Sequence, residues 1–342
     1  MHFTNCTKCD FSITEDHNFV DGTCDKCGAT EVVEPEEPIY NASVKIPGKA
    51  GLFESDFSLI YYVPKSYPTN WYIKVEKESF SESTPTITTL TEADIYTTQG
   101  NYYLVALRGI SAKQVANEIT ATLYAEVNGV MSYGDALDFN LKDYAEDRIA
   151  KSTDADLVAA MKAFLNYAAA CQTRFNYNTS DLANATLSSE DKVIIPPTEI
   201  TNENNVKEYI KIDNPTASVA GFAVSYEDKM TLAPILKVPS DYATTGIQVK
   251  IEYKGKADYI SLKDDSQAYS GSYRIVYFTG LAIKEVREPV IITVIDSNGN
   301  AISNSRKYSF ESFASDWEDG EKDYNPSRAM VTFGDLFKIY KD

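Results

Sequence analysis

Four cysteines near the start of the chain have a spacing that allows metal chemistry. They form two Cys-x-x-Cys pairs, Cys6 with Cys9 and Cys24 with Cys27, in the pattern C-x2-C-x14-C-x2-C. Two intervening residues let both sulfurs of a pair face one ion, and tetrahedral Zn2+ accepts four thiolates. We therefore expect these cysteines to bind a structural Zn2+ in a zinc-ribbon-like unit that spans residues 1–38.

Two disulfides are the alternative for the same cysteines, because an oxidising extracellular setting favours them. A short unit with few large apolar residues needs a metal or cross-links to stay folded. A redox role requires a βαβ pattern, which is missing around these pairs. His2 and His17 lie nearby, but four thiolates complete the zinc shell, so we expect His17 to pack against the unit. The sequence leaves zinc and disulfides open.

The charge of the chain argues against nucleic acid as a partner. Residues 1–38 contain two lysines and nine acidic residues, and the whole chain has 50 Asp and Glu against 32 Lys and Arg, a net charge of -18. Proteins bind phosphate backbones through Lys and Arg that displace counterions, whereas an acidic surface repels them. Since no run approaches the ~18 apolar residues of a membrane span, we also expect no direct membrane insertion.

The rest of the chain has the pattern of strands followed by helices, in two segments. The acidic linker EVVEPEEP ends the first unit, and the prolines of KVIIPPTEITNEN mark a boundary near residue 197. Between them, SLIYYVP, WYIKVEKE, NYYLVALRG and ITATLYAEVNG are rich in Tyr, Val, Ile and Thr, and several alternate in the two-residue period of half-buried strands. A helix is predicted next, with Thr153 and Asp156 as a capping box and an apolar stripe at 3.6-residue spacing. The stripe consists of Leu157, Met161, Phe164, Leu165, Ala168, Cys171 and Phe175.

The segment after residue 197 repeats the segment before it. Residues 100–129 align with residues 271–299, and the offset between matched positions stays between 169 and 176 residues. The closing helix recurs as well, with Asn325 and Pro326 as its predicted N-cap and first-turn pair. Matched pairs are Gly109 and Gly280, Val115 and Val286, Met161 and Met330, and Phe164 and Phe333. We interpret the repeat as a tandem duplication.

These patterns predict a mainly β (α+β) fold. A zinc-ribbon-like knuckle over residues 1–38 is followed by two tandem duplicated antiparallel β-sandwich-like domains, residues 39–196 and 197–342. Each domain is expected to have about seven strands and a C-terminal helix. The apolar stripe of each helix needs a partner surface, either the sheet of its own copy or that of its neighbour.

Residues 160–184, AMKAFLNYAAACQTRFNYNTSDLAN, resemble a segment of large secreted or cell-surface proteins of Gram-positive gut anaerobes, an uncharacterised modular family. Residues 17–31, HNFVDGTCDKCGATE, are similar to the short Cys-x-x-Cys repeats of the same proteins. Members usually have Gly and Ala where this chain has Ala168 and Cys171. The resemblance implies an extracellular or cell-surface protein with a modular, non-catalytic role, and only the cysteine pairs carry over as a site.

The first residues, MHFTNCTKCD, contain neither a basic n-region nor an apolar h-region. The chain is therefore either cytoplasmic or a piece without its signal peptide. Because of the resemblance, we expect the second.

We expect no enzymatic activity. Both histidines precede residue 18, which removes His-dependent catalysis and His-ligated metal centres from residues 39–342. No glycine-rich nucleotide-binding motif occurs. Cys171 lies on the apolar helix stripe with no base near it in the sequence, so we expect it to be a buried packing residue. A carboxylate pair of the glycosidase type cannot be recognised among 50 acidic residues in one sequence.

Two functions fit these expectations. The first is a structural spacer or protein-interaction module, with a protein or cell-wall partner; the sequence does not determine the oligomeric state. The second is a carbohydrate-binding module, which needs exposed aromatic rings. Its candidate residues are Tyr67, Trp71 and Tyr72 in KSYPTNWY, although Trp71 begins a strand and the alternative is that it packs inward. In the second copy only Tyr242, opposite Tyr67, is kept.

Two acidic turns, residues 263–271 and 296–303, contain the oxygen ligands that Ca2+ takes. Neither has the twelve-residue loop pattern of known Ca2+ sites. We therefore expect ordinary turns at both places rather than Ca2+ sites.

Overall fold

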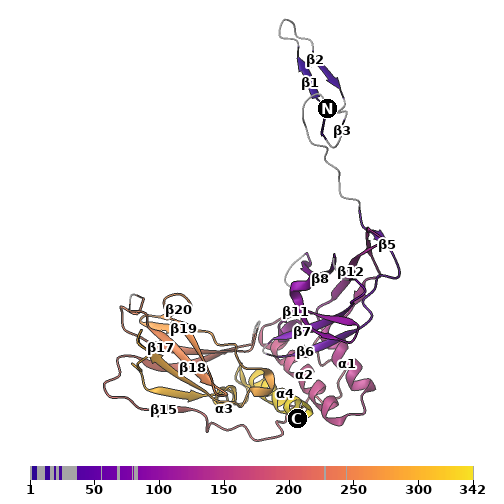
Figure 1. The fold of residues 1–342 in the computed structure, drawn as a ribbon. Helices are drawn as coiled ribbons and strands as arrows, with labels where there is room; N and C mark the ends of the chain where they lie inside the picture. The colour runs from indigo at the N-terminus through magenta and orange to yellow at the C-terminus, as the bar shows by residue number, and fades with distance from the viewer. Residues whose placement is uncertain are drawn as a thin grey trace.

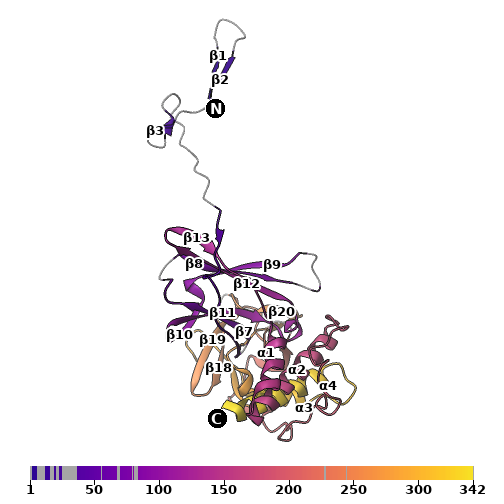
Figure 2. The same ribbon diagram turned by 90° about the vertical axis from the view of Figure 1, so that its right-hand side faces the viewer.

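Two β-rich halves meet at a pair of helices in the computed structural model (Figures 1 and 2). The structure describes residues 2–5, 12–15, 19–20, 23–24, 37–54, 56–67, 70–78, 80, 84–226, 229–243 and 245–341. Strands predominate over helices in these residues, which confirms the mainly β, α+β class. No helix in the described ranges is long and apolar enough to cross a membrane.

The first half contains two antiparallel sheets around an apolar core. Its strands are β5 (Ile39–Tyr40), β6 (Lys49–Phe53), β7 (Phe57–Pro64), β8 (Trp71–Lys77), β9 (Thr86–Leu90), β10 (Ile95–Gln99), β11 (Tyr102–Ile110), β12 (Ile119–Val127), β13 (Val130–Tyr133) and β14 (Leu137–Asp138). One sheet has the order β10-β11-β7-β6 and the other β5-β13-β12-β8-β9, with β14 paired to β12. Only β5, which pairs with β13, is parallel to its neighbour among these strands. Side chains of β8 and β12 alternate between buried and more exposed, as the sequence pattern predicted.

The second half repeats this arrangement. Its strands are β15 (Val206–Ile210), β16 (Ser218–Ser225), β17 (Thr231–Lys237), β18 (Gln248–Tyr253), β19 (Lys256–Ser261), β20 (Gln267–Ser270), β21 (Tyr273–Ile275), β22 (Val290–Ile295) and β23 (Ser305–Tyr308). One sheet has the order β20-β21-β17-β16 and the other β15-β23-β22-β18-β19. The first of these sheets matches β10-β11-β7-β6, and the β22-β18-β19 part of the second matches β12-β8-β9. The four sheets support the predicted β-sandwich-like architecture, although the described strands number ten in the first half and nine in the second rather than about seven in each.

Helices follow the strands in both halves. The first half has the 3-10 helices η1 (Glu92–Asp94) and η2 (Ala112–Gln114) and the α-helices α1 (Leu141–Lys151) and α2 (Ala155–Arg174). The second half has η3 (Ile283–Glu285), α3 (Phe310–Ser315) and α4 (Tyr324–Lys341). Each of α1 and α3 begins after an N-cap side chain, Asn140 or Ser309, that accepts a hydrogen bond from the backbone N–H three residues later. The two halves therefore share local capping as well as strand order.

Both long helices begin close to the predicted place, α2 one residue later and α4 two residues earlier. Asp154, rather than Thr153, is the N-cap of α2, because its carboxylate accepts hydrogen bonds from the backbone N–H groups of Asp156 and Leu157. Helix α4 begins at Tyr324, so Asn325 lies inside its first turn instead of capping it. Shifts of this size are usual at helix ends, where several polar residues compete for the cap.

The two long helices pack against each other, and the neighbouring half supplies part of their partner surface (Figure 2). Phe164 of α2 and Phe333 of α4 are fully buried, with ring centroids 5.3 Å apart. Phe53 of β6 contacts Phe333 at 5.8 Å and Phe337 at 5.4 Å, so the first half's sheet reaches the second half's helix. We call this contact, made by α2, α4 and the end of β6 and start of β7, the seam.

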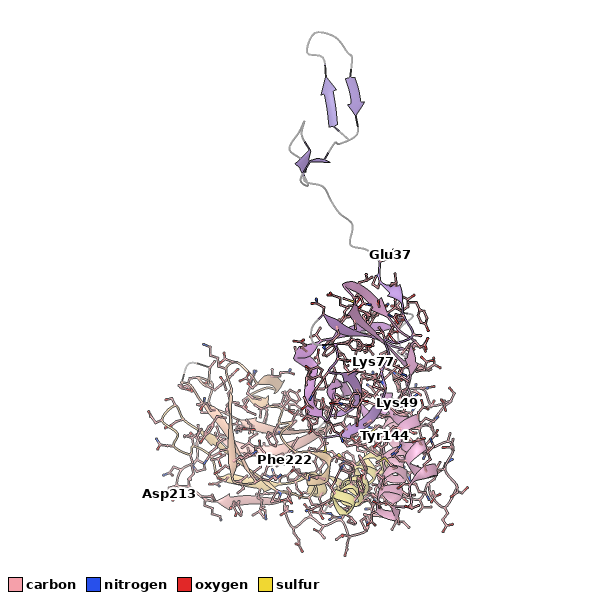
Figure 3. All side chains as sticks on the ribbon, turned by 45° about the vertical axis from the view of Figure 1, so that its right-hand side comes forward. Glu37, Lys49, Lys77, Tyr144, Asp213 and Phe222 are labelled. Carbon is pink, nitrogen blue, oxygen red and sulfur yellow. The ribbon has the colours of Figure 1, made fainter. Side chains whose placement is uncertain are left out.

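The apolar core runs through the seam without interruption. Phe53 also approaches Tyr144 of α1, at 6.1 Å between ring centroids, and Tyr144 lies beside the seam in Figure 3. A backbone hydrogen bond of 3.0 Å from the N–H of Ile283 to the carbonyl of Glu54 joins η3 to the first half. The halves are therefore held together by both apolar packing and hydrogen bonding.

Candidate functional site

The cysteine site falls mostly outside the described residues. Cys6, Cys9 and Cys27 lie there, while Cys24 belongs to β4 (Thr23–Cys24), which pairs with β3 (Phe19–Val20). Farther upstream, β1 (His2–Asn5) pairs with β2 (Ser12–Glu15). Within the part of the chain that the structure describes, no group of three or more His, Cys, Asp or Glu side chains could hold a metal ion. Zinc at the four cysteines thus stays a prediction.

A thiol and metal assay tests that prediction directly. We expect about one Zn2+ per chain, because four thiolates at this spacing complete one tetrahedral site. Metal analysis by mass spectrometry gives the stoichiometry. Thiol titration of the denatured chain should then find all five cysteines reduced. A metal-free protein with a single free thiol would instead show that two disulfides hold the unit.

Cys171 is a packing residue, as expected. Its side chain is fully buried in α2 beside Tyr167, and burial raises the pKa of its thiol far above the usual range. A thiol that stays protonated is a poor nucleophile and a poor metal ligand.

The two acidic turns form ordinary turn contacts. The carboxylate of Asp296 accepts hydrogen bonds from the backbone N–H groups of Asn298 and Asn300, which lower the pKa of Asp296. Asp264 accepts a hydrogen bond from the hydroxyl of Ser261. These carboxylates therefore shape their own turns.

Two of the three predicted sugar-binding aromatics face the core. Trp71, at the start of β8, is only 4% exposed, and its ring stacks on Tyr103 with centroids 6.0 Å apart. Tyr67 packs against the core, and its hydroxyl donates a hydrogen bond to the carbonyl of Ser43 at 3.1 Å. The buried position of Trp71 corresponds to the inward-packing alternative, so its ring offers no surface for a sugar.

Tyr72 belongs to a row of tyrosines that crosses four strands. Its ring stacks on that of Tyr124 with centroids 4.6 Å apart and an angle of 6° between the rings. Tyr124 lies 5.5 Å from Tyr133, which in turn lies 5.9 Å from Tyr40. We call these four residues, Tyr40, Tyr72, Tyr124 and Tyr133, the tyrosine row.

Strand register creates the tyrosine row. Tyr72 of β8 is the direct partner of Tyr124 on β12, Tyr124 that of Tyr133 on β13, and Tyr133 that of Tyr40 on β5. Because the neighbours Trp71 and Ile73 point inward, Tyr72 must point outward. The sequence could suggest outward positions on each strand but not the register that aligns them.

Polar side chains surround the tyrosine row. The hydroxyl of Tyr40 donates to Asp135 at 2.8 Å, and the amide of Asn70 donates to Glu126 at 2.7 Å. Tyr40 is 55% exposed. Rings flanked by carboxylates and amides can bind sugars. The face-to-face contact of Tyr72 with Tyr124, however, covers one face of each ring.

A buried polar cluster crosses the seam. The carboxylate of Asp323, just before α4, accepts hydrogen bonds from Arg174 Nε and from the hydroxyl of Tyr226, both at 2.6 Å. Burial, followed by the hydrogen bond to Asp323, raises the pKa of Tyr226, and the same carboxylate raises the pKa of Arg174. Both donors therefore keep their protons, and each satisfies an oxygen lone pair of Asp323.

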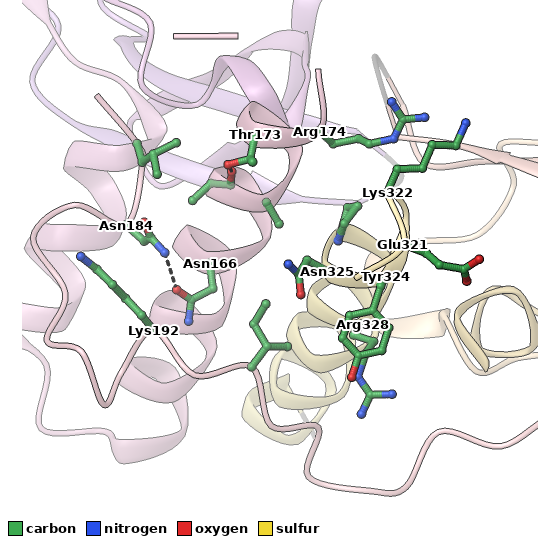
Figure 4. Close-up of a pocket in the computed structure, with 15 residues that line it drawn as sticks. Asn166, Thr173, Arg174, Asn184, Lys192, Glu321, Lys322, Tyr324, Asn325 and Arg328 are labelled. Atoms are coloured by element: carbon green, nitrogen blue, oxygen red, sulfur yellow. Dashed lines mark hydrogen bonds between the residues drawn. The ribbon is translucent and has the colours of Figure 1, made fainter. Parts of the chain in front are cut away.

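A cavity lies beside this cluster, between α2, α4 and the segment that follows α2 (Figure 4). Its volume is about 620 Å³. The amide of Asn184 donates to the side-chain oxygen of Asn166 at 2.9 Å and fixes one wall. We call this cavity the seam pocket. No sequence motif pointed to it, since its lining comes from segments roughly 150 residues apart along the chain.

Comparison with protein-family models finds no match to this sequence, and a search of curated proteins finds no significant match.

Proposed function

We propose that the chain is a non-catalytic module of a secreted or cell-surface protein, acting as a structural spacer or protein-interaction module. Its two β-sandwich-like domains, residues 39–196 and 197–342, follow a zinc-ribbon-like unit. The observation that carries this proposal is the seam, where Phe53 and Phe164 of the first domain enclose Phe333 of the second.

The seam favours a spacer because it fixes the geometry of the pair. Interfaces between domains of one chain are commonly polar, and relative motion is the default expectation. Here the interface is aromatic and fully buried, and a hydrogen-bonded ion pair lies next to it. A large apolar interface removes that freedom. A binding surface on one domain would therefore stay at a constant distance from a binding surface on the other.

Calorimetry and solution scattering test this role. We expect the two domains to unfold in one cooperative transition and the scattering profile to fit a single rigid shape. Two separate transitions, or a profile that requires many relative orientations of the domains, would rule out a stiff spacer.

A carbohydrate-binding module is the second candidate, and the tyrosine row is the observation that favours it. Four rings in register lie across one sheet, with the carboxylates and the amide of Asp135, Glu126 and Asn70 beside them. We rank it second because the stacked rings of Tyr72 and Tyr124 cover each other.

Replacing Tyr124 with alanine tests the carbohydrate alternative. If the row binds polysaccharide, the variant should bind at least about tenfold more weakly in affinity gels, because Tyr124 is the central ring and contacts two others. Tyr269→Ala, an exposed tyrosine of the second half, is the matched control and should bind as the parent does. The alternative is lost if no polysaccharide is retained or if both variants bind equally.

A further inference from the structure

The seam pocket is cationic in a strongly acidic chain. Lys and Arg make up 32 of the 342 residues of the chain. They contribute four of the fifteen residues that line this pocket, and the only acidic residue of the lining is Glu321. The four cationic residues are Arg174, Lys192, Lys322 and Arg328. The local excess of positive charge is thus opposite in sign to the net charge of the molecule.

Three of these cations have no carboxylate partner in the described part of the chain. Lys192 donates only to the backbone carbonyl of Ala185, at 3.2 Å, and the guanidinium of Arg328 lies over the ring of Tyr324. Lys322 is exposed and makes no ion pair with another described residue. Glu321 accepts the backbone N–H of Glu318 and forms no ion pair with a cation among the described residues, so four positive charges face one negative charge in the lining. The charges of Lys192, Lys322 and Arg328 are therefore available to a ligand.

The arrangement of these cations fits an extended ligand better than a compact one. In Figure 4, Lys192 lies on the α2 side of the pocket, while Lys322 and Arg328 project at separate places on the α4 side. A single phosphate would reach one or two of them. A cavity of about 620 Å³ has the size of sites that bury drug-sized ligands, so it can take part of an extended chain. Several anionic groups spaced along a chain would satisfy all three cations.

The rest of the lining favours a peptide over an acidic sugar. The lining also contains apolar side chains, those of Ala169, Ala170, Leu182, Ile194 and Pro326. Tyr324 is the only aromatic residue of the lining, and Arg328 covers its ring at 5.1 Å, which leaves little surface for a sugar to stack on. Apolar contacts alongside cationic positions suit a peptide with Val or Pro between glutamates.

We propose that the seam pocket binds an extended acidic peptide. The chain contains a sequence of this chemistry, EVVEPEEP at residues 31–38, with four glutamates separated by valine and proline. In a second copy of this chain, this linker is the partner that the charge of the pocket selects. The proposal specifies a partner for the interaction role above and rests on it. Peptide binding and stiffness of the seam are measured separately, so either can fail alone.

Titration of the intact protein with a labelled EVVEPEEP peptide tests the proposal. We expect saturable binding by fluorescence anisotropy at low ionic strength, weakening as salt is added. The peptide QVVQPQQP, with the same shape but no charge, should not bind. The double variant Lys322→Glu, Arg328→Glu should bind the acidic peptide at least about tenfold more weakly, because two attractions become repulsions.

The matched control carries the same change of net charge elsewhere. Lys256→Glu, Lys263→Glu alters two exposed lysines of the second half and should bind as the parent does. Unchanged thermal unfolding of both double variants excludes misfolding as the cause of any loss. The proposal is overturned if EVVEPEEP does not bind, if QVVQPQQP binds equally well, or if both double variants behave alike. It is also overturned if trigalacturonate or inorganic phosphate binds the pocket more tightly than the peptide.

Discussion

Replacing Phe333 with alanine should lower the free energy of unfolding by about 3–5 kcal/mol, the usual cost of emptying a buried phenylalanine site. The ring is fully buried and contacts Phe53, Phe57 and Phe164 at centroid distances of 5.8, 6.2 and 5.3 Å. A loss of this size is large beside the ~5–15 kcal/mol that stabilises a typical domain. Urea unfolding followed by circular dichroism measures it.

Both halves should lose stability in Phe333→Ala, because its aromatic neighbours Phe53, Phe57 and Phe164 belong to the first half. A single transition that moves to lower urea, or separates into two, is the expected signature. Phe333→Leu should cost much less, since it keeps most of the volume. Tyr269→Ala, at a site 56% exposed, should stay within about 0.5 kcal/mol of the parent. A loss below about 1 kcal/mol in Phe333→Ala would show that the seam is not part of the core.

Helical periodicity was sufficient to predict the buried stripe of α2. Met161, Phe164, Leu165, Ala168 and Cys171 are buried, and Leu157 and Phe175 are partly buried against the core, because an apolar face that recurs every 3.6 residues packs against a partner. The alignment of two segments of the sequence likewise predicted the shared strand order, since similar patterns of apolar residues select similar pairings.

The partner of that stripe could not be decided from the sequence. Periodicity shows that Phe333 is covered. It does not show that Phe164 of the other half covers it, because an apolar stripe does not determine which surface packs against the helix. The tyrosine row could not be predicted for a similar reason. Tyr72 and Tyr133 are 61 residues apart, and only strand register brings both rings next to Tyr124. The seam pocket depends on tertiary packing alone, which brings Lys192 and Lys322 to one cavity.

Removing the carboxylate in Asp323→Ala should cost about 2–4 kcal/mol. The change leaves Arg174 and Tyr226 without the acceptor that both use at 2.6 Å. Breaking a buried pair costs about 3–5 kcal/mol. The side chain of Arg174 is 27% exposed, so water compensates part of this loss. Equilibrium unfolding of the single variants measures each loss.

A double-mutant cycle with Arg174→Met separates the ion pair from packing, since methionine keeps much of the aliphatic stem of arginine. The coupling between the two sites should be about 1–3 kcal/mol. Asp323→Asn, which keeps an oxygen acceptor but removes the charge, should be less damaging than Asp323→Ala. Additive losses in the cycle would show that the two side chains do not act as a pair.

The same cluster should make the protein sensitive to alkaline pH. Burial and the neighbouring Asp323 raise the pKa of Tyr226 in the folded state, whereas in the unfolded chain it stays near ~10. The folded state therefore holds the proton more tightly, so the contribution of Tyr226 to stability is complete below pH ~10 and declines above it.

Burial also raises the pKa values of Tyr61, Tyr167 and Tyr308, so their contributions to stability decline over the same pH range. Between pH ~9 and ~11 each such tyrosine should lower the free energy of unfolding by about 1.4 kcal/mol. Tyr226→Phe should be less stable than the parent at neutral pH. Over that interval its free energy of unfolding should fall by about 1.4 kcal/mol less than that of the parent, as measured by urea unfolding. Equal losses would show that the titration of Tyr226 does not contribute to the alkaline sensitivity.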